Sequence, residues 1–202
     1  MQEKPPHKFF RWIWFLDRIQ FWHKDELVHR RYADAARSLA VPKDHSIWKK
    51  VRTEEADYKG AHSDIVEFFK AFQKACHKRN IPLRAFEFVR TAERQQELYE
   101  KGFTKAQAGF GAHQYGMAVD CIVAHKAWSL SKKQWACLIA IGKEVARRRN
   151  IKIDSGYDWD FWDPAHWELE GWKEMIAPKQ PDKPYKKNKF YDIKTGKLHE
   201  IE

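Results

Sequence analysis

At 202 residues with a formal net charge of +10, the chain is long enough for one domain with a buried core and basic enough to attract a polyanion. Its 10 tryptophans and 13 phenylalanines exclude a disordered chain. Charge alone does not choose between nucleic acid and an anionic bacterial cell wall as the partner. The three cysteines (Cys76, Cys121 and Cys137) are widely spaced and form no Cys-x-x-Cys pair, which excludes a disulfide framework and predicts buried thiols made in a reducing compartment.

Residues 1–43 are predicted to form a basic, aromatic N-terminal segment. Its helix is expected from Asp17 to Ala40 and ends there because proline follows at position 42. The longest uncharged apolar run, residues 12–16, is too short for a signal-peptide core or a membrane span, so we expect a chain made in the cytoplasm. The apolar stripe of this helix either packs on the main body or lies on a membrane surface. Its members are Phe21, Trp22, Leu27, Val28 and Tyr32.

Residues 44–177 are predicted to form the main domain. The predicted helices cover 63–78, 91–99 and 131–149, and the predicted strands cover 85–90, 118–123, 151–154 and 166–169. The helices are expected to begin at Ser63, Thr91 and Ser131, whose hydroxyl groups suit N-cap positions. The first strand is predicted because Phe86 and Phe88 alternate with polar or small residues.

Residues 178–202 form a polar, lysine-rich tail, which is predicted to end in a small hairpin about Thr195-Gly196. The order of elements along the whole chain predicts an α+β fold. In this fold we expect helices on one side of a small sheet and candidate ligands at the ends of its strands.

Two short motifs in the main domain carry metal-binding side chains. The first reads His113-x-x-Gly116-x-Ala118-x-Asp120, and the second reads Asp163-x-x-His166-x-Glu168. Two imidazoles and one carboxylate (His113, Asp120 and His166) make a candidate zinc site with three protein ligands, which leaves the fourth position to water. Gly116 permits a sharp reversal after the first ligand, and strand alternation puts the small Ala118 on the same face as Asp120.

Asp163 precedes Pro164 in a predicted turn, where it can reach a metal-bound water without being a ligand itself. A bound zinc ion lowers the pKa of such a water to about 7 and polarises a substrate carbonyl. Asp163 would take the proton of the water and pass it to the leaving amine, a role worth about 10²- to 10⁴-fold in rate. The chemistry that these residues predict is hydrolysis of an amide.

The combined motifs resemble the zinc D-Ala-D-Ala carboxypeptidase and L-alanyl-D-glutamate endopeptidase family, which includes VanY-type carboxypeptidases and many phage endolysins. The likeness covers about residues 60–172. It also includes Val89-Arg90-Thr91 followed by Gln95, Leu98, Tyr99 and Gly102, and Ser155-Gly156-Tyr157-Asp158-Trp159 ahead of the second motif.

The resemblance implies a compact domain of the DD-peptidase and hedgehog-like type, with a small antiparallel sheet flanked by helices. It implies zinc on His113, Asp120 and His166, catalytic base function for Asp163, and substrate binding by Arg90 and Gln95. Arg90 also suits that role by its own chemistry, because a guanidinium fork binds the carboxylates that peptidoglycan stem peptides carry. The alternative for Arg90 is an ion pair with Glu93 or Glu97.

Two positions depart from the family pattern. Gly111 stands where serine is usual, which removes a hydroxyl group that could orient the site or the substrate. Trp167 stands where phenylalanine or tyrosine is usual, which is a mild change on a buried face. The first departure bears on specificity or rate and leaves zinc binding as predicted.

The leading hypothesis is a zinc metallopeptidase that cuts the L-Ala–D-Glu bond of bacterial peptidoglycan. As an endolysin it would be a monomer made in the host cytoplasm and released to the cell wall by a partner such as a holin. One alternative is a D-Ala-D-Ala carboxypeptidase or dipeptidase with the same metal site. Another is a catalytically silent basic module that binds wall polymer or nucleic acid, although no sequence signature of a specific nucleic-acid binder accompanies the charge.

Overall fold

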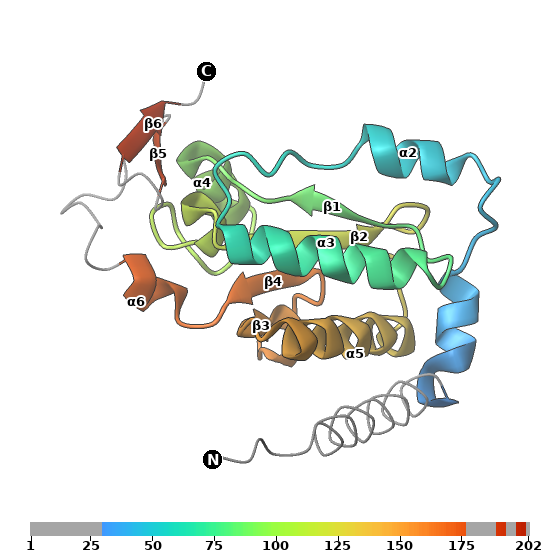
Figure 1. Cartoon of the computed structure of the whole chain (residues 1–202). Coiled ribbons are helices and arrows are strands. Elements are labelled where there is room, and N and C mark those ends of the chain that lie inside the picture. The colour runs from blue at the N-terminus through green and yellow to red at the C-terminus, as the bar shows by residue number, and fades with distance from the viewer. Residues whose placement is uncertain (1–29, 177–188, 193–196, 201–202) are drawn as a thin grey trace, which may run out of the picture.

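A four-stranded antiparallel sheet organises the computed structural model, which describes residues 30–176, 189–192 and 197–200 (Figure 1). Its strands are β1 (Leu83–Glu87), β2 (Ala118–Val123), β3 (Ile153–Ser155) and β4 (His166–Leu169), and they lie in the order β1-β2-β4-β3. Every neighbouring pair is antiparallel. The structure therefore confirms the predicted α+β class with a small antiparallel sheet.

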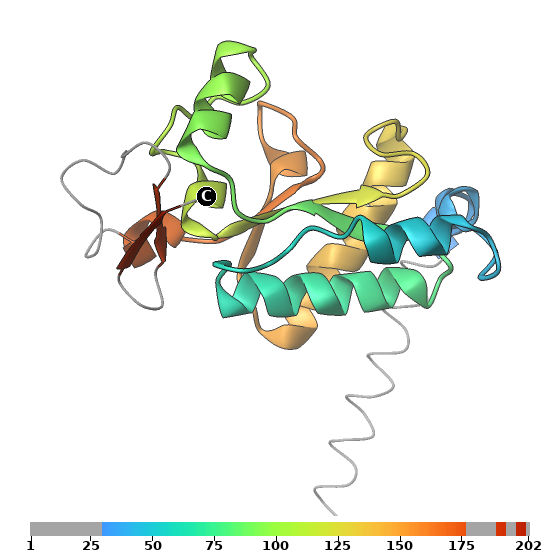
Figure 2. The same ribbon diagram turned by 90° about the horizontal axis from the view of Figure 1, so that it is seen from above.

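Two long helices, α3 (Ser63–His77) and α5 (Lys132–Arg149), pack on one face of this sheet. Figure 2 shows α4 (Ala92–Glu100) and the segment around η2 (Gly156–Asp158) on the side of the sheet away from α3. The prediction that helices lie on one side is thus right for the long helices and wrong for α4. The remaining elements are α2 (Ile47–Thr53), η1 (Ala112–Tyr115), α6 (Trp172–Ile176) and a separate antiparallel pair, β5 (Lys189–Asp192) and β6 (Lys197–Glu200).

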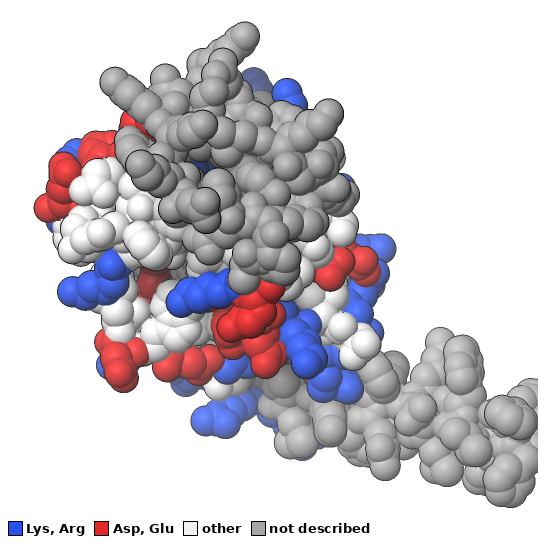
Figure 3. Space-filling model, turned by 90° about the vertical axis from the view of Figure 1, so that its left-hand side faces the viewer, with Lys and Arg blue, Asp and Glu red and all other residues white. Residues whose placement is uncertain are grey.

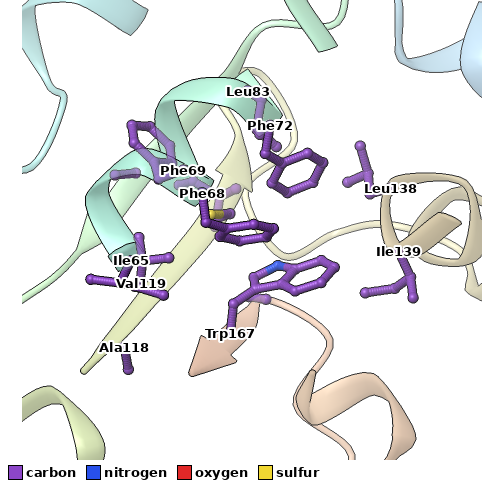
Figure 4. Close-up of a cluster of buried hydrophobic side chains, with 14 of the residues drawn as sticks. Ile65, Phe68, Phe69, Phe72, Leu83, Ala118, Val119, Leu138, Ile139 and Trp167 are labelled. Atoms are coloured by element: carbon purple, nitrogen blue, oxygen red, sulfur yellow. The ribbon is translucent and has the colours of Figure 1, made fainter. Parts of the chain in front are cut away.

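The hydrophobic core fills the space between the sheet and the two long helices (Figure 4). Trp167 of β4 lies under α3, with its ring centroid 5.1 Å from that of Phe68 and 5.3 Å from that of Phe72. The residues of α3 that helical spacing predicts to face inward are all buried, namely Ile65, Phe68, Phe69, Phe72 and Cys76. The three cysteines are free and buried, as predicted.

The first described residues of the chain contribute to this core. Residues 30–39 are helical, and Leu39 is fully buried in the same cluster as α3 and α5. The described end of the predicted N-terminal helix therefore packs on the main body. Most of the predicted apolar stripe lies outside the described residues, and so do Lys179, Lys183, Lys186 and Lys187 of the tail and the turn about Thr195-Gly196. The predicted limits of the three segments stay predictions. Among the helices of the described residues, none combines the length and apolarity that crossing a bilayer requires.

Several predicted element limits are wrong, and one is that of β3, which spans Ile153–Ser155 instead of residues 151–154. The N-cap of α3 is His62 instead of Ser63, because the Nδ1 atom of His62 accepts a hydrogen bond from the Asp64 N–H group at 3.2 Å. Strand β1 begins at Leu83 and its pairing with β2 is irregular after Ala85, so Phe86 turns outward and is 41% exposed. The caps predicted for the other two helices are confirmed, since the hydroxyl groups of Thr91 and Ser131 accept hydrogen bonds from the first turn.

Gly142 of α5 makes room for the tryptophan at position 167. A Cβ atom on Gly142 would overlap the Trp167 ring and lie 2.8 Å from its Cζ2 atom. The absence of a side chain at position 142 therefore leaves the space that the large Trp167 ring occupies.

Replacing Gly142 with alanine is therefore expected to destabilise the protein by about 1–3 kcal/mol, although alanine alone would favour the helix by about 1 kcal/mol. Urea denaturation measures this free energy of unfolding. The matched double variant, Gly142→Ala with Trp167→Phe, should recover part of the loss because the smaller ring vacates the contact. A Gly142→Ala protein that is more stable than the parent would contradict this account.

Candidate metal centre

Three side chains from three different elements converge on one point above the sheet. The His113 Nε2 atom lies 3.1 Å from Asp120 Oδ1 and 3.1 Å from His166 Nδ1, and His166 Nδ1 lies 3.2 Å from Asp120 Oδ1. Asp120 on β2 and His166 on β4 are direct partners in the antiparallel register, so their side chains leave the sheet side by side. The structure thus brings the three predicted ligands together, and their donor atoms are close enough to one another to hold a metal ion.

The third ligand, His113, is held over the sheet by η1. Its Nδ1 atom contacts the Phe88 carbonyl oxygen at 2.9 Å, which leaves Nε2 to face the other two ligands. The chain reverses at Gly116, whose φ of 67° lies in the left-handed region, and a Cβ atom there would overlap the carbonyl oxygen of Gly60. The predicted reversal after His113 is therefore confirmed, and it depends on glycine for both reasons.

His166 is held in a similar way from its outer side. Its Nε2 atom lies 3.0 Å from Glu168 Oε2, and the Trp172 Nε1–H group donates to Glu168 Oε1 at 3.0 Å. His166 and Glu168 are two residues apart on β4, so strand alternation puts them on one face. An outer carboxylate of this kind fixes the ring of a metal-binding histidine with Nδ1 turned inward.

The electrostatics of the site favour a positive charge among the three ligands. Burial alone would raise the pKa of Asp120, but the neighbouring imidazoles of His113 and His166 outweigh it and hold this pKa well below its usual range. Burial alone would lower the pKa of His166, but the carboxylates of Asp120 and Glu168 outweigh it and raise this pKa to about 10. The same carboxylates would stabilise a bound metal cation.

The donor atoms also have the spacing that a tetrahedral metal ion requires. Metal–nitrogen and metal–oxygen bonds of about 2.0–2.1 Å at tetrahedral angles separate neighbouring donor atoms by about 3.3 Å. The three separations of 3.1–3.2 Å in this site are close to that value. With the outer nitrogens of His113 and His166 donating to oxygen atoms, both inner nitrogens present lone pairs to the centre.

Asp163 lies beside this centre in the segment before β4. Its N–H group donates to the Gly156 carbonyl oxygen at 2.9 Å, and its own carbonyl oxygen accepts from the His166 N–H group at 3.1 Å. A Cβ atom at position 156 would overlap the carbonyl oxygen of Asp163, so glycine is needed for this close approach. Burial, followed by the charge of Asp120, raises the pKa of the Asp163 carboxyl group.

Arg90 forms a hydrogen bond with Asp120, one of the three candidate ligands. Its Nη2 group donates to Asp120 Oδ2 at 3.0 Å, and its Nε–H group donates to Glu87 Oε2 at 2.6 Å. Arg90 forms ion pairs with Glu87 and Asp120, which face each other in the register of β1 and β2. Glu97 instead pairs with Arg94 and Lys101. Arg90 therefore steadies the Asp120 carboxylate from the side opposite the histidines, and its predicted contact with substrate stays a prediction.

Gln95 occupies the space that Gly111 leaves open. It is 1% exposed, its Oε1 atom accepts from Arg90 at 3.1 Å, and its Nε2 group donates to the Ala106 carbonyl oxygen at 2.6 Å. A Cβ atom on Gly111 would lie 2.8 Å from Gln95 Oε1. The predicted role of Gln95 in binding substrate stays a prediction, and these contacts make it a residue that positions Arg90. Glycine at position 111 is compatible with this arrangement, whereas serine would crowd it.

The four site residues and Arg90 line a cleft of about 870 Å³. Two carboxylates in it, Glu87 and Glu168, have structural roles that sequence reasoning missed. The His-x-Glu spacing on a strand could have indicated Glu168, because the two residues share a face. Glu87 could not be found this way, because its partner Asp120 becomes adjacent only through strand pairing.

Many of the basic residues form ion pairs with acidic ones, and the net charge of +10 remains. Figure 3 shows acidic and basic side chains side by side among the described residues of one face. In the arginine run at the end of α5, Arg148 donates to Glu144 at 2.8 Å and Arg149 donates to Glu67 at 3.0 Å. These contacts hold the arginine run at the C-terminal end of α5, where cations also suit the helix dipole.

The chain has one kind of similarity to known proteins, which is to solved structures. No protein-family model and no curated protein sequence matches the chain. Among solved structures, the chain is similar to the crystal structure of an L-Ala D-Glu endopeptidase of Serratia marcescens, with 21% sequence identity and a TM-score of 0.47. The similarity covers 61% of this chain and 96% of that one.

Proposed function

We propose that the chain is a zinc metallopeptidase that hydrolyses the L-Ala–D-Glu bond of bacterial peptidoglycan stem peptides. The observation that carries the proposal is the convergence of His113, Asp120 and His166 beside a separate, partly buried carboxylate, Asp163. Two imidazole nitrogens and one carboxylate oxygen are a donor set that suits zinc, and three protein ligands leave a position for reaction. The choice of stem peptides is supported by the sequence motifs shared with peptidoglycan peptidases.

The residues around the site have distinct tasks in this reaction. Zinc, when bound, supplies a Lewis acid that polarises the scissile carbonyl group. The Asp163 carboxylate accepts a proton from the attacking water and then donates it to the leaving amine. Burial raises the pKa of Asp163, which makes the group a better proton acceptor than an exposed aspartate. Arg90 lies within one hydrogen bond of Asp120, where its guanidinium group can also orient a carboxylate or carbonyl group of the substrate.

Mass spectrometry of digested muropeptides tests this proposal. We expect products with a new N-terminal D-Glu, loss of these products with a zinc chelator and their return when zinc is added. Released terminal D-Ala would instead support the carboxypeptidase alternative. Tight, salt-dependent binding to DNA without any hydrolysis would support the silent binding module. Release by a holin and action as a monomer stay predictions.

Replacing Glu168 with glutamine should weaken zinc binding by about 10- to 100-fold, because the outer carboxylate that orients His166 and strengthens its basicity is lost. Competition with a chromogenic chelator measures this affinity. Glu170→Gln is the matched control, since Glu170 is exposed two residues further along the chain. Equal zinc affinities for the two variants would show that the Glu168 contact does not support the metal site.

A further inference from the structure

The mouth of the cleft is unusually rich in exposed aromatic side chains. Among the described residues, nine large hydrophobic side chains are exposed, and seven of the nine line this one cleft. These seven, which we call the aromatic rim, are Phe86, Phe103, Phe110, Trp128, Trp159, Phe161 and Trp162. Phe103 and Phe110 are the most exposed, at 68% and 63%. A large, contiguous patch of exposed apolar side chains indicates an interaction site, whereas single exposed apolar residues do not.

The aromatic rim comes from four segments that surround the metal centre, namely β1, the loop after α4, the loop after β2 and the segment before β4. Phe86 of β1 packs edge-on against Trp128 with ring centroids 4.6 Å apart. Phe161, in the segment before β4, carries the ammonium group of Lys105 over its ring at 5.1 Å. Trp159 lies 5.1 Å from the ring of His166, between centroids. The rim therefore reaches from the surface to the candidate ligands themselves, and its rings are partly held in place by neighbours.

The stem peptide alone does not explain this surface. The residues on either side of the proposed scissile bond are alanine, which offers one methyl group, and glutamate, which is anionic. Neither side chain can cover seven aromatic rings. A partner of larger apolar area must lie close to the reacting bond if the rim has a ligand.

In peptidoglycan, a sugar lies close to the L-Ala–D-Glu bond. The L-Ala residue is joined to the glycan strand through one lactyl group, so the sugar lies about two residue lengths, or about 7 Å, from the L-Ala–D-Glu bond. Pyranose rings present C–H faces that stack on flat aromatic rings, while their hydroxyl and acetamido groups stay at the edges for polar contacts. A bond further along the stem peptide would lie beyond this reach.

We infer that the aromatic rim binds the glycan strand next to the stem peptide being cut, so that the acetamido sugars help to place the scissile bond at the metal centre. This inference rests on the proposed function for the identity of the bond. A lipid surface is the less favoured ligand, because the same cleft contains the carboxylates of Glu87, Asp163 and Glu168, which a bilayer interior would strip of water.

The experiment compares two substrates with the same peptide, one carrying the disaccharide and one without sugar. The variants are Phe103→Ala with Phe110→Ala, and Phe161→Ala with Trp162→Ala. Trp159 is left unchanged because it packs against His166. We expect each double variant to lower kcat/KM at least about tenfold on the disaccharide substrate and to leave the sugar-free substrate nearly unaffected. Tyr58→Ala is the control, since Tyr58 is 48% exposed and lies outside the cleft.

A binding measurement separates this inference from the proposed function. Bare glycan strands, prepared by removing the peptides from peptidoglycan, should bind the zinc-free protein and change its tryptophan fluorescence. The double variants should bind these strands at least about tenfold more weakly than the Tyr58→Ala control. If neither peptide substrate is cut but glycan strands bind through the rim, the proposed function fails and the sugar site stands. Equal losses on both substrates, or rim-dependent binding to anionic lipid vesicles without binding to glycan strands, would overturn the inference.

Discussion

Replacing His166 with alanine is expected to abolish zinc binding and to lower the rate of peptide hydrolysis by at least about 10³-fold. The substitution removes one of the three donor atoms that lie 3.1–3.2 Å apart. It also leaves the carboxylates of Asp120 and Glu168 without the imidazole that contacts both. Metal analysis of the purified protein and a muropeptide assay measure the two effects together.

His125→Ala is the matched control for this experiment, because His125 is exposed in the loop after β2. It should keep both zinc and activity. Because His166 is buried, its loss could also affect folding, so Asp120→Asn serves as a second ligand variant. Circular dichroism reports whether each protein is folded. A folded His166→Ala protein that retains full activity, or parent protein that is equally active after zinc has been stripped, would refute the metal site.

Replacing Asp163 with asparagine is expected to lower kcat by about 10²- to 10⁴-fold while the bound zinc remains. The carboxamide keeps the size of the side chain and cannot accept the proton of the attacking water. Asp163 lies in the cleft beside the ligands and is not among the three donor atoms that converge. Loss of rate with zinc retained would therefore distinguish a proton-transfer residue from a ligand.

The control for Asp163 is Asp160→Asn, which changes an exposed carboxylate in the same segment. The two variants carry the same change of charge, so a general electrostatic effect would appear in both. We expect the Asp160 variant to keep nearly full activity. If Asp163→Asn loses its zinc as well, Asp163 supports the metal site instead of transferring protons.

Much of the local structure could be predicted because it depends on neighbours in the sequence. The caps at Thr91 and Ser131 are contacts within one helical turn. The buried face of α3 follows from helical spacing, and strand β2 was predicted with its correct limits. Errors arose where a contact outside the local pattern decided the outcome. Irregular pairing with β2 turns Phe86 outward. The cap of α3 is a different kind of error, because this contact is also local: the imidazole of His62 accepts from the Asp64 N–H group in place of the hydroxyl group of Ser63.

The sequence by itself determined the α+β class and the three candidate ligands, because short motifs combine ligand chemistry with the glycine and strand spacing that presents it. Only the tertiary structure decided what surrounds them. Strand pairing places Glu87 beside Asp120, and Arg90 joins the two carboxylates. The packing of four separate segments around one cleft creates the aromatic rim. Such neighbours are distant in sequence, so no local periodicity records them, and they become visible only when the chain has folded.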